Sequence, residues 1–169
     1  MSVNSTRKTA LVLVILLLCI GLDQGTKSLA RKNLVQGQRV SYFHDTFRLQ
    51  LTKNSGAFLG MGTSLPDQLR FTIFTLLVAG ILLAGLGYLL LLFQGDQRFI
   101  PGATLVLGGG ISNLADRILY EGRVIDFMNV GLGSLRTGIF NVADMNIMAG
   151  TCLVLFFLFR SRMRGVHPL

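Results

Sequence analysis

The chain has 169 residues, of which 51% are hydrophobic and only 14% are charged. A soluble domain carries roughly 25% charged residues, so this chain has too few polar groups to cover a water-facing surface. Its length leaves room for one domain, residues 1–169, without an appended soluble module. Composition therefore excludes an ordinary soluble protein and predicts an integral membrane protein.

The formal net charge of +8 raises the question of nucleic-acid binding. The basic residues, however, are scattered at the ends of apolar stretches, and the chain has no recognisable nucleic-acid-binding motif. Attraction to anionic lipid headgroups explains them more simply. We therefore expect membrane phospholipids as partners and no nucleic acid.

The cysteines and histidines give no sign of a metal site. Cys19 and Cys152 both lie inside apolar runs, without CxxC spacing. His44 and His167 are too far apart for an HExxH zinc motif. We expect the protein to work without a metal or a cofactor.

Four segments have the length and apolarity of a transmembrane helix, which needs about 20 apolar residues. They cover about residues 9–30, 71–93, 99–117 and 137–159. The first could instead be a cleaved signal peptide, because Arg7 and Lys8 precede its apolar core. No A-x-A cleavage site follows, and Asp23 with Lys27 prolongs the helical pattern, which favours an uncleaved span.

The connections between these spans are unequal. Residues 94–98 form a tight turn, 118–136 an intermediate connection and 31–70 a long one. Within the long connection, residues 47–53 alternate between apolar and polar, which is typical of a half-buried strand. Asn54-Ser55-Gly56 then favours a turn. The pattern predicts a small sheet on the membrane surface.

Four spans would put both termini on one side of the membrane. Six of the sixteen basic residues fall on the side of the termini and ten on the opposite face, so the positive-inside count alone does not decide the orientation. The density of arginines after the last span favours cytoplasmic termini. The basic residues on the terminal side are Arg7, Lys8, Arg98, Arg160, Arg162 and Arg164.

Five of the eight acidic residues fall at the same membrane face, because successive spans alternate in direction. An ionisable group at bilayer depth costs about a few kcal/mol or more, so its presence there needs a structural or functional reason. Asp144, expected about two turns into the fourth span, is the most costly. The five acids are Asp23, Asp116, Glu121, Asp126 and Asp144.

Asp126 and Asp144 both lie in apolar settings, where two neighbouring carboxylates cannot both ionise cheaply. Such a pair holds one proton, and it can take a proton from water while giving one to a scissile carbonyl oxygen. Aspartyl proteolysis is one interpretation. A proton relay or transporter, and structural pairing with Arg117 or Arg123, stay open on position alone.

The neighbouring residues add polar groups to the same face. Asn113 and Arg117 share a helical face with Asp116, and Asn141 stands at i−3 from Asp144. Such amides could orient a carboxylate, bind a peptide backbone or only satisfy helix ends. Asp23 and Lys27 have the i,i+4 spacing of an ion pair. The glycines at 85, 87 and 108–110 predict close helix packing.

Five motifs, in this order along the chain, resemble the lipoprotein signal peptidase (signal peptidase II) family. Each is weak alone, but together they are specific and extend over nearly the whole chain. They are Asp23-Gln-Gly-Thr-Lys27, Asn54-Ser-Gly-Ala-Phe58, Gly108-Gly-Gly-Ile-Ser-Asn113-Leu-Ala-Asp116-Arg117, Val124-Ile-Asp126-Phe127 and Phe140-Asn-Val-Ala-Asp144.

The resemblance implies an all-α membrane fold, with a four-helix transmembrane bundle and a small β-cradle on the outer surface. It implies an aspartic endopeptidase of the bacterial inner membrane, with cytoplasmic termini and a periplasmic active site. The substrates would be prolipoproteins whose cysteine carries diacylglycerol, cut just before that cysteine. We expect a monomer.

The resemblance also implies a role for each matching residue. Asp126 and Asp144 match the catalytic dyad. Four residues match substrate-binding positions, namely Asn54, Asn113, Arg117 and Asn141, and three match structural polar positions, namely Asp23, Lys27 and Asp116. Departures at Phe58-Leu59-Gly60 and at Gly110-Ile111 concern packing or pocket shape and put substrate preference in doubt.

Three other functions would also be compatible with parts of this sequence. A serine–lysine peptidase is disfavoured because Lys27 and Ser28 are adjacent and point to different helix faces. A proton-coupled transporter would be expected to spread its acids through the membrane depth or to show internal repeats. A non-catalytic membrane scaffold is the third.

Overall fold

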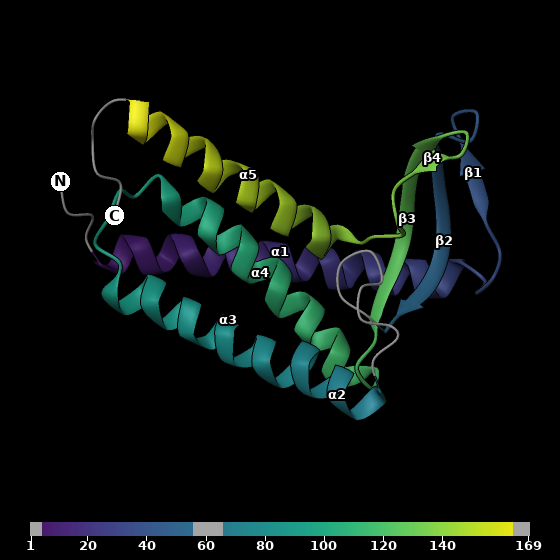
Figure 1. Ribbon diagram of the computed structural model, residues 1–169, viewed down its shortest axis with the longest axis horizontal. Coiled ribbons are helices and arrows are strands. Elements are labelled where there is room, and N and C mark those ends of the chain that lie inside the picture. The colour runs from purple at the N-terminus through teal and green to yellow at the C-terminus, as the bar shows by residue number, and fades with distance from the viewer. Residues whose placement is uncertain (1–4, 56–65, 164–169) are drawn as a thin grey trace.

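The protein is a bundle of long helices with a small sheet across one end (Figure 1). The structure, a computed structural model, describes residues 5–55 and 66–163. Helix α1 begins, and α5 ends, at the end of the bundle away from the sheet. The long helices are α1 (Ser5–Asn33), α4 (Phe99–Leu119) and α5 (Val142–Met163).

A further helical rod lies between α1 and α4 in the sequence. It consists of α2 (Asp67–Phe71), the π-helical segment η2 (Thr72–Leu77), α3 (Val78–Gly87) and a second π-helical segment, η3 (Tyr88–Leu92). The backbone stays helical from one segment to the next, and the rod ends where Phe93 turns to an extended conformation.

Among the described residues, three helices are long and apolar enough to cross a membrane. They are Ser5–Asn33, Thr75–Leu92 and Val142–Met163. Their outward surfaces are apolar, since Leu17, Leu83 and Leu91 are 72%, 72% and 81% exposed. Exposed leucines on this scale suit a lipid environment, because a water-facing surface of this kind would aggregate. Helix α4 has a comparable length, but its glycines and polar residues make it less apolar.

Helix α4 is central to the bundle because three consecutive glycines each face a different helix. A side chain at Gly108 would collide with Cys19 of α1, one at Gly109 with the Ala143 carbonyl of α5, and one at Gly110 with Leu82 of α3. The predicted close packing is therefore confirmed at 108–110. Gly85 is also approached closely, by Leu107, whereas a side chain at Gly87 would meet open space.

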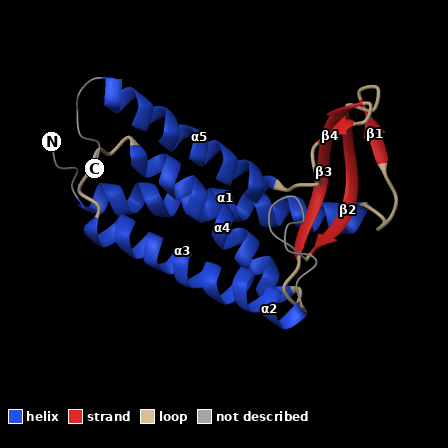
Figure 2. Ribbon diagram, viewed as in Figure 1, coloured by secondary structure: helices blue, strands red, loops and turns tan. Residues whose placement is uncertain are grey.

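The sheet is antiparallel, in the order β1-β2-β3-β4, and its strands run crosswise to the helices (Figure 2). The strands are β1 (Val40–Tyr42), β2 (Phe47–Asn54), β3 (Val124–Leu132) and β4 (Leu135–Arg136). The strand predicted at residues 47–53 is confirmed by β2. The turn predicted at 54–56, and the Phe58-Leu59-Gly60 departure, extend into residues that lie outside the described part.

The sequence did not predict β3, and it misplaced the start of the last helix. Residues 137–141 are not helical, because Phe140 forms a β-bridge with Met128 of β3. Helix α5 therefore begins at Val142, and Asp144 lies in its first turn rather than about two turns inside. This correction brings Asp144 to the level of the sheet, where Asp126 lies.

Candidate active site

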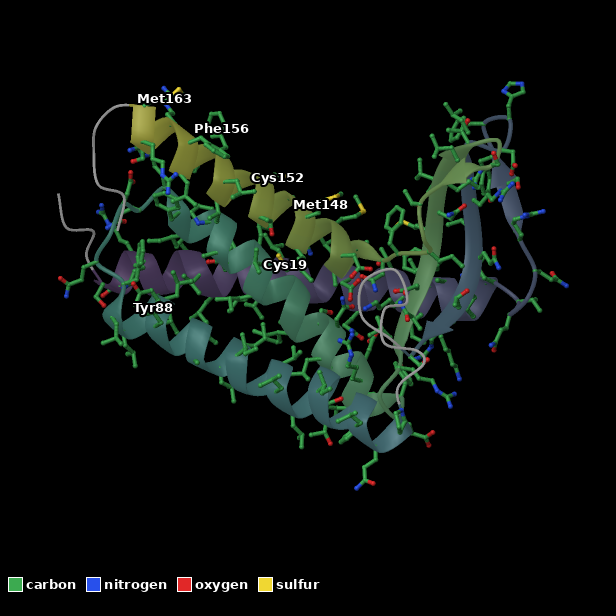
Figure 3. The ribbon with its side chains drawn as sticks, in the orientation of Figure 1. Cys19, Tyr88, Met148, Cys152, Phe156 and Met163 are labelled. Carbon is green, nitrogen blue, oxygen red and sulfur yellow. The ribbon has the colours of Figure 1, made fainter. Side chains whose placement is uncertain are left out.

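The two candidate carboxylates meet where α5 joins the sheet. Asp126 lies on β3 and is 2% exposed, whereas Asp144 lies in the first turn of α5 and is partly exposed. Between them stands Asn141, which is fully buried. In Figure 3, nitrogen and oxygen atoms gather at this junction, while the helices beyond it carry mostly carbon side chains.

Asn141 contacts both carboxylates. Its Nδ2 donates to Asp126 Oδ1 at 2.6 Å, and its backbone N–H donates to Asp144 Oδ2 at 3.2 Å. In return, its Oδ1 accepts the backbone N–H of Asp144 at 2.9 Å. This reciprocal pair of bonds at positions i and i+3 is a capping box at the start of α5. The local rule that begins the helix therefore also fixes the Asp144 carboxylate.

Two further asparagines donate to the pair, one to each carboxylate. Asn113 of α4 donates from Nδ2 to Asp144 Oδ1 at 2.9 Å, and Asn54 of β2 donates from Nδ2 to Asp126 Oδ2 at 2.9 Å. Asn141 also donates to Asn113 Oδ1, at 3.1 Å. Three asparagines distant in sequence thus surround the two acids.

Arg117 is buried on the inner side of this cluster. Its guanidinium donates to the backbone carbonyl of Asn113 at 3.3 Å, and it is attracted electrostatically by Asp144, Asp126 and Asp116. The structure thus brings all four residues predicted to bind substrate, Asn54, Asn113, Arg117 and Asn141, to the two candidate carboxylates. Arg123, the other arginine considered as a partner, is exposed.

The environment of Asp126 favours its protonated form. Burial raises the pKa of the Asp126 carboxyl to about 7, because the charged form loses its hydration. The negative charge of Asp144 adds to the rise, whereas hydrogen bonds from Asn54 and Asn141 and the charge of Lys27 oppose it. A carboxyl with a pKa near 7 can exchange a proton at neutral pH.

Behind the dyad lies a buried group of charges. Lys27 Nζ lies 2.6 Å from Asp23 Oδ2 and 2.8 Å from Asp116 Oδ2, and both acids are fully buried. The i,i+4 ion pair predicted between Asp23 and Lys27 is therefore confirmed. Glu121, the fifth acid predicted at this face, is exposed in the turn after α4 and does not join the cluster.

Sequence reasoning missed two polar residues of this group. Ser112 Oγ donates to Asp23 Oδ2 at 2.7 Å, and Gln24 Nε2 donates to Asp116 Oδ1 at 2.8 Å. The signal for Ser112 was its position four residues before Asp116, which puts both on one helical face. For Gln24, the only signal was its position next to Asp23 in the sequence.

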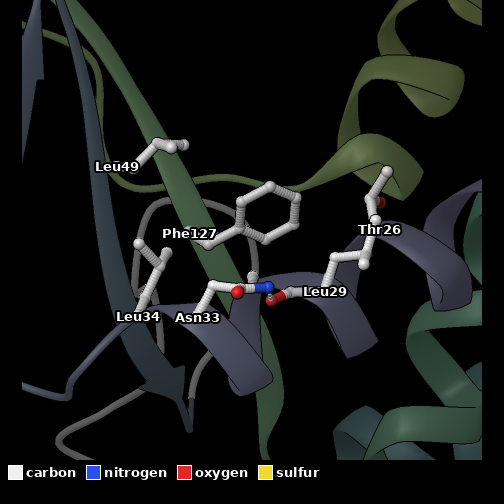
Figure 4. A pocket seen from close by; sticks show the side chains of 7 residues that line it. Thr26, Leu29, Asn33, Leu34, Leu49 and Phe127 are labelled. Atoms are coloured by element: carbon white, nitrogen blue, oxygen red, sulfur yellow. Dashed lines mark hydrogen bonds between the residues drawn. The ribbon is translucent and has the colours of Figure 1, made fainter.

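An apolar pocket of about 300 Å³ lies beside the cluster, between the outer part of α1 and the sheet (Figure 4). Leu29, Leu49 and Phe127 line it, and Phe127 is the residue next to Asp126. Leu29 is also 61% exposed, so one wall of the pocket belongs to the apolar outer surface of α1. Among the described residues, no group of three or more His, Cys, Asp or Glu could hold a metal ion.

An apolar helix bundle, a sheet at one end and two neighbouring carboxylates together fit the class of aspartic peptidases that work in a membrane. The sequence profile of the Signal peptidase (SPase) II family matches residues 15–160. The chain therefore belongs to the signal peptidase II family.

Curated relatives and solved structures agree with this assignment. The Lipoprotein signal peptidase of Streptococcus pneumoniae is 32% identical over 94% of this chain and 99% of its own length. Those of Aquifex aeolicus and Bacillus subtilis are 34% and 33% identical, covering 92% and 83% of this chain and 90% and 88% of theirs. A solved bacterial membrane enzyme at 23% identity has the same fold, with a TM-score of 0.78 over 90% of both chains.

Proposed function

We propose that this peptidase removes the signal peptide from diacylglyceryl-modified prolipoproteins, cutting just before the lipid-bearing cysteine, and that Asp126 and Asp144 are its catalytic dyad. The observation that carries the dyad is Asn141, whose backbone N–H donates to Asp144 and whose side-chain amide donates to Asp126. Family membership supports prolipoproteins as the substrate class.

The chemistry follows from a pair that shares one proton. A water between the carboxylates attacks the scissile carbonyl carbon, the ionised carboxylate takes a proton from that water, and the other gives its proton to the carbonyl oxygen. Collapse of the tetrahedral diol then breaks the C–N bond. The carboxyl that took the proton from water gives it to the leaving amine, and the other carboxylate takes a proton from a diol hydroxyl, which restores the single shared proton. Because the acids are coupled, the apparent pKa values belong to the dyad.

Four residues around the dyad are proposed to hold the substrate backbone. Asn54, Asn113 and Asn141 present amide groups to the carboxylates, and an amide can donate to one group while accepting from another. Arg117 supplies a buried positive charge that offsets the negative charge of the site. Asp144 is the more exposed of the two acids, so substrate would approach from its side.

The apolar pocket supports a lipid-bearing substrate. It is bounded by Leu29, Leu49 and Phe127, and it joins the lipid-facing surface of α1 to the strand that carries Asp126. An acyl chain could enter it from the bilayer without crossing water, which would cost about 0.8 kcal/mol per exposed CH₂. A soluble peptide gains nothing from such an opening.

The proposed arrangement is a monomeric four-span bundle in the bacterial inner membrane, with cytoplasmic termini and a periplasmic active site. The common end at which α1 begins and α5 ends supports an even number of crossings. In this arrangement α4 is the third span along the chain, shielded from lipid by its neighbours, which explains how a less apolar helix can cross.

The dyad is tested by Asp126→Asn and Asp144→Asn, assayed on a lipidated precursor peptide in detergent. Each variant loses one of the two groups that must exchange protons, so cleavage should fall by at least about 10³-fold while the protein still inserts. Asp96→Asn is the matched control, because Asp96 pairs with Arg98 in the turn before α4.

Full activity in either dyad variant would remove the proposed mechanism. The same preparation, given the precursor without its lipid, should cleave it far more slowly. Equal rates on both precursors would contradict the requirement for diacylglycerol and leave the peptidase assignment intact.

A further inference from the structure

The buried charges behind the dyad are connected to both of its members. Lys27 on α1 bridges two acids, Asp23 on the same helix and Asp116 on α4. All three side chains are at most 3% exposed. No step of the proposed reaction uses them, so their burial needs a separate explanation.

Each of these two acids also holds the backbone beside one catalytic carboxylate. Asp23 Oδ1 accepts the backbone N–H of Ala143, the residue before Asp144, at 2.8 Å. Asp116 Oδ2 accepts the backbone N–H of Ile125, the residue before Asp126, at 3.0 Å. Lys27 is therefore connected through Asp23 to the residue before Asp144, and through Asp116 to the residue before Asp126.

The lysine has a third contact that leads to the same place. Lys27 Nζ donates to Asn113 Oδ1 at 3.0 Å. Because this oxygen is occupied by donors, the NH₂ group of Asn113 must point the other way, where it donates to Asp144 Oδ1 at 2.9 Å. The lysine thus fixes the orientation of an amide that contacts the reacting carboxylate.

We propose that Asp23, Lys27 and Asp116 form a positioning clamp, which sets the separation of the two catalytic carboxylates and the electrostatic field in which they share a proton. The proposal rests on the proposed function of the dyad. Lys27 is a positioning residue within it, because it acts on the dyad through Asn113 and through the two acids and touches no reacting atom.

Stability alone does not explain the clamp. Taking a lysine and two carboxylates out of water costs free energy that their mutual attraction does not necessarily repay, and apolar side chains of similar volume often serve as well. Apolar side chains could not accept the N–H groups of Ala143 and Ile125. They also could not supply a positive charge to the site.

The charge of Lys27 has its own effect, because it lowers the pKa of Asp126. Asp144 on α5 opposes that effect, and the amides of Asn54 and Asn141 assist it. Arg117 on α4 is a second cation near the dyad. With Lys27 removed, Asp126 should retain its proton to a higher pH, and the basic limb of the pH–rate profile should move to higher pH.

The test compares Lys27→Met with Lys8→Met, measured as rate per mole of monodisperse protein in detergent on a lipidated precursor peptide. Lys8 lies on the same helix, near the other end of the bundle, where it donates to the Phe93 carbonyl at 3.2 Å. Lys27→Met should lower kcat on the order of 10²-fold, since a small displacement of reacting groups has this effect. KM should change much less than kcat, because Lys27 itself does not touch the substrate. Lys8→Met should change neither.

The pH profile separates positioning from a structural role. A residue that only stabilises the fold would reduce the amount of active protein and leave the pH–rate profile of the remainder unmoved. An unmoved basic limb in Lys27→Met, or an unchanged kcat, would therefore overturn the clamp.

Two milder variants keep the proposal testable if Lys27→Met does not fold. Ser112→Ala removes one hydrogen bond to Asp23, and Gln24→Leu removes one to Asp116. Each should lower kcat on the order of tenfold with KM unchanged, as is typical when a residue that orients a reacting group is lost. Unchanged kcat in both variants would overturn the proposal.

Failure of the clamp and failure of the dyad give different results. If Asp126→Asn keeps full activity, the proposed mechanism fails, and the clamp fails with it. If Asp126→Asn is inactive and Lys27→Met behaves as the control does, the clamp alone fails.

Discussion

At the scale of single residues, Asn141 shows how a rule of helix formation builds a reactive site. An Asn followed three residues later by an acid is a capping box, and it satisfies backbone N–H groups that would otherwise lack partners at a helix start. Here the acid of the box is Asp144, and the side-chain NH₂ group of Asn141 also donates to Asp126. Helix initiation and the pairing of the acids therefore depend on one side chain.

The asparagine on the other side of the pair influences the pH at which the proposed dyad loses its proton. Asn54 donates to Asp126 and so stabilises the ionised form, which lowers a pKa that burial has raised to about 7. Asn54→Ala removes this donor, so the upper apparent pKa of the dyad should rise. Activity needs one proton on the pair, and the basic limb of kcat against pH should therefore move to higher pH. A shift to lower pH would contradict the assignment of this limb to Asp126.

Several of these residues could be predicted from the sequence because spacing along a helix fixes a shared face. Asn113 and Asp116 needed only the i,i+3 rule. Asn141 reaches Asp144 in a different way, because it lies just before α5 and caps the helix. The depth of Asp144 could not be predicted in this way. Apolar residues before it, such as Ile139 and Phe140, are compatible with a helix, and only the pairing of Phe140 with β3 shows otherwise.

At the scale of elements, the glycines of α4 bring the helices close enough to make the site. Gly109 faces Ala143, and Ala143 precedes Asp144, so the close approach of α4 to α5 positions one of the two proposed catalytic carboxylates. Glycine runs are recognisable in a sequence as close-packing sites. Which helix each glycine faces is not, because it depends on the packing of the whole bundle.

Gly109→Ala should disturb both stability and catalysis. Its side chain would collide with the Ala143 carbonyl and lie 2.8 Å from Ile147 Cγ1, and backbone cannot yield as a flexible side chain can. Overpacking of this kind costs about 1–3 kcal/mol. The melting temperature in detergent should fall, and kcat should fall with it as Asp144 is displaced.

Gly87→Ala is the matched control for this helix-packing prediction. A side chain at Gly87 meets nothing within 4 Å, and alanine is the better helix former. Its melting temperature should stay the same or rise slightly, with kcat unchanged. Equal losses in both variants would show that helix propensity, rather than the contact between α4 and α5, decides the outcome.

The strand β3 illustrates why an element can escape prediction. Residues 124–128 are mostly apolar and give no clean alternation, so periodicity does not separate a buried strand from a helical segment. The strand β2 was readable because its alternation was regular. On one side β2 pairs with β3, where Thr52 lies opposite Asp126. That pairing depends on the whole fold and not on a local pattern.

At the scale of the whole molecule, the site is assembled from segments that the sequence separates widely. Asp23 and Ala143 are 120 residues apart, and Lys27 and Asn113 are 86 apart, yet each pair is hydrogen bonded. Alternating spans predicted that these acids would share a membrane face. The contacts themselves could not be predicted, because they depend on how α1, α4 and α5 pack around one another.

The same alternation makes a prediction about orientation that labelling can check. Ser134 lies in the exposed turn between β3 and β4, and Gln94 is exposed in the turn before α4, at the opposite end of the bundle. In a Cys152→Ser background, which removes the exposed native thiol, Ser134→Cys should react with a membrane-impermeant maleimide on intact bacterial spheroplasts. Gln94→Cys should react only after the membrane is opened, because its turn would face the cytoplasm. Labelling of both from outside would contradict the four-span arrangement, and the reverse pattern would invert it and put the dyad on the cytoplasmic side.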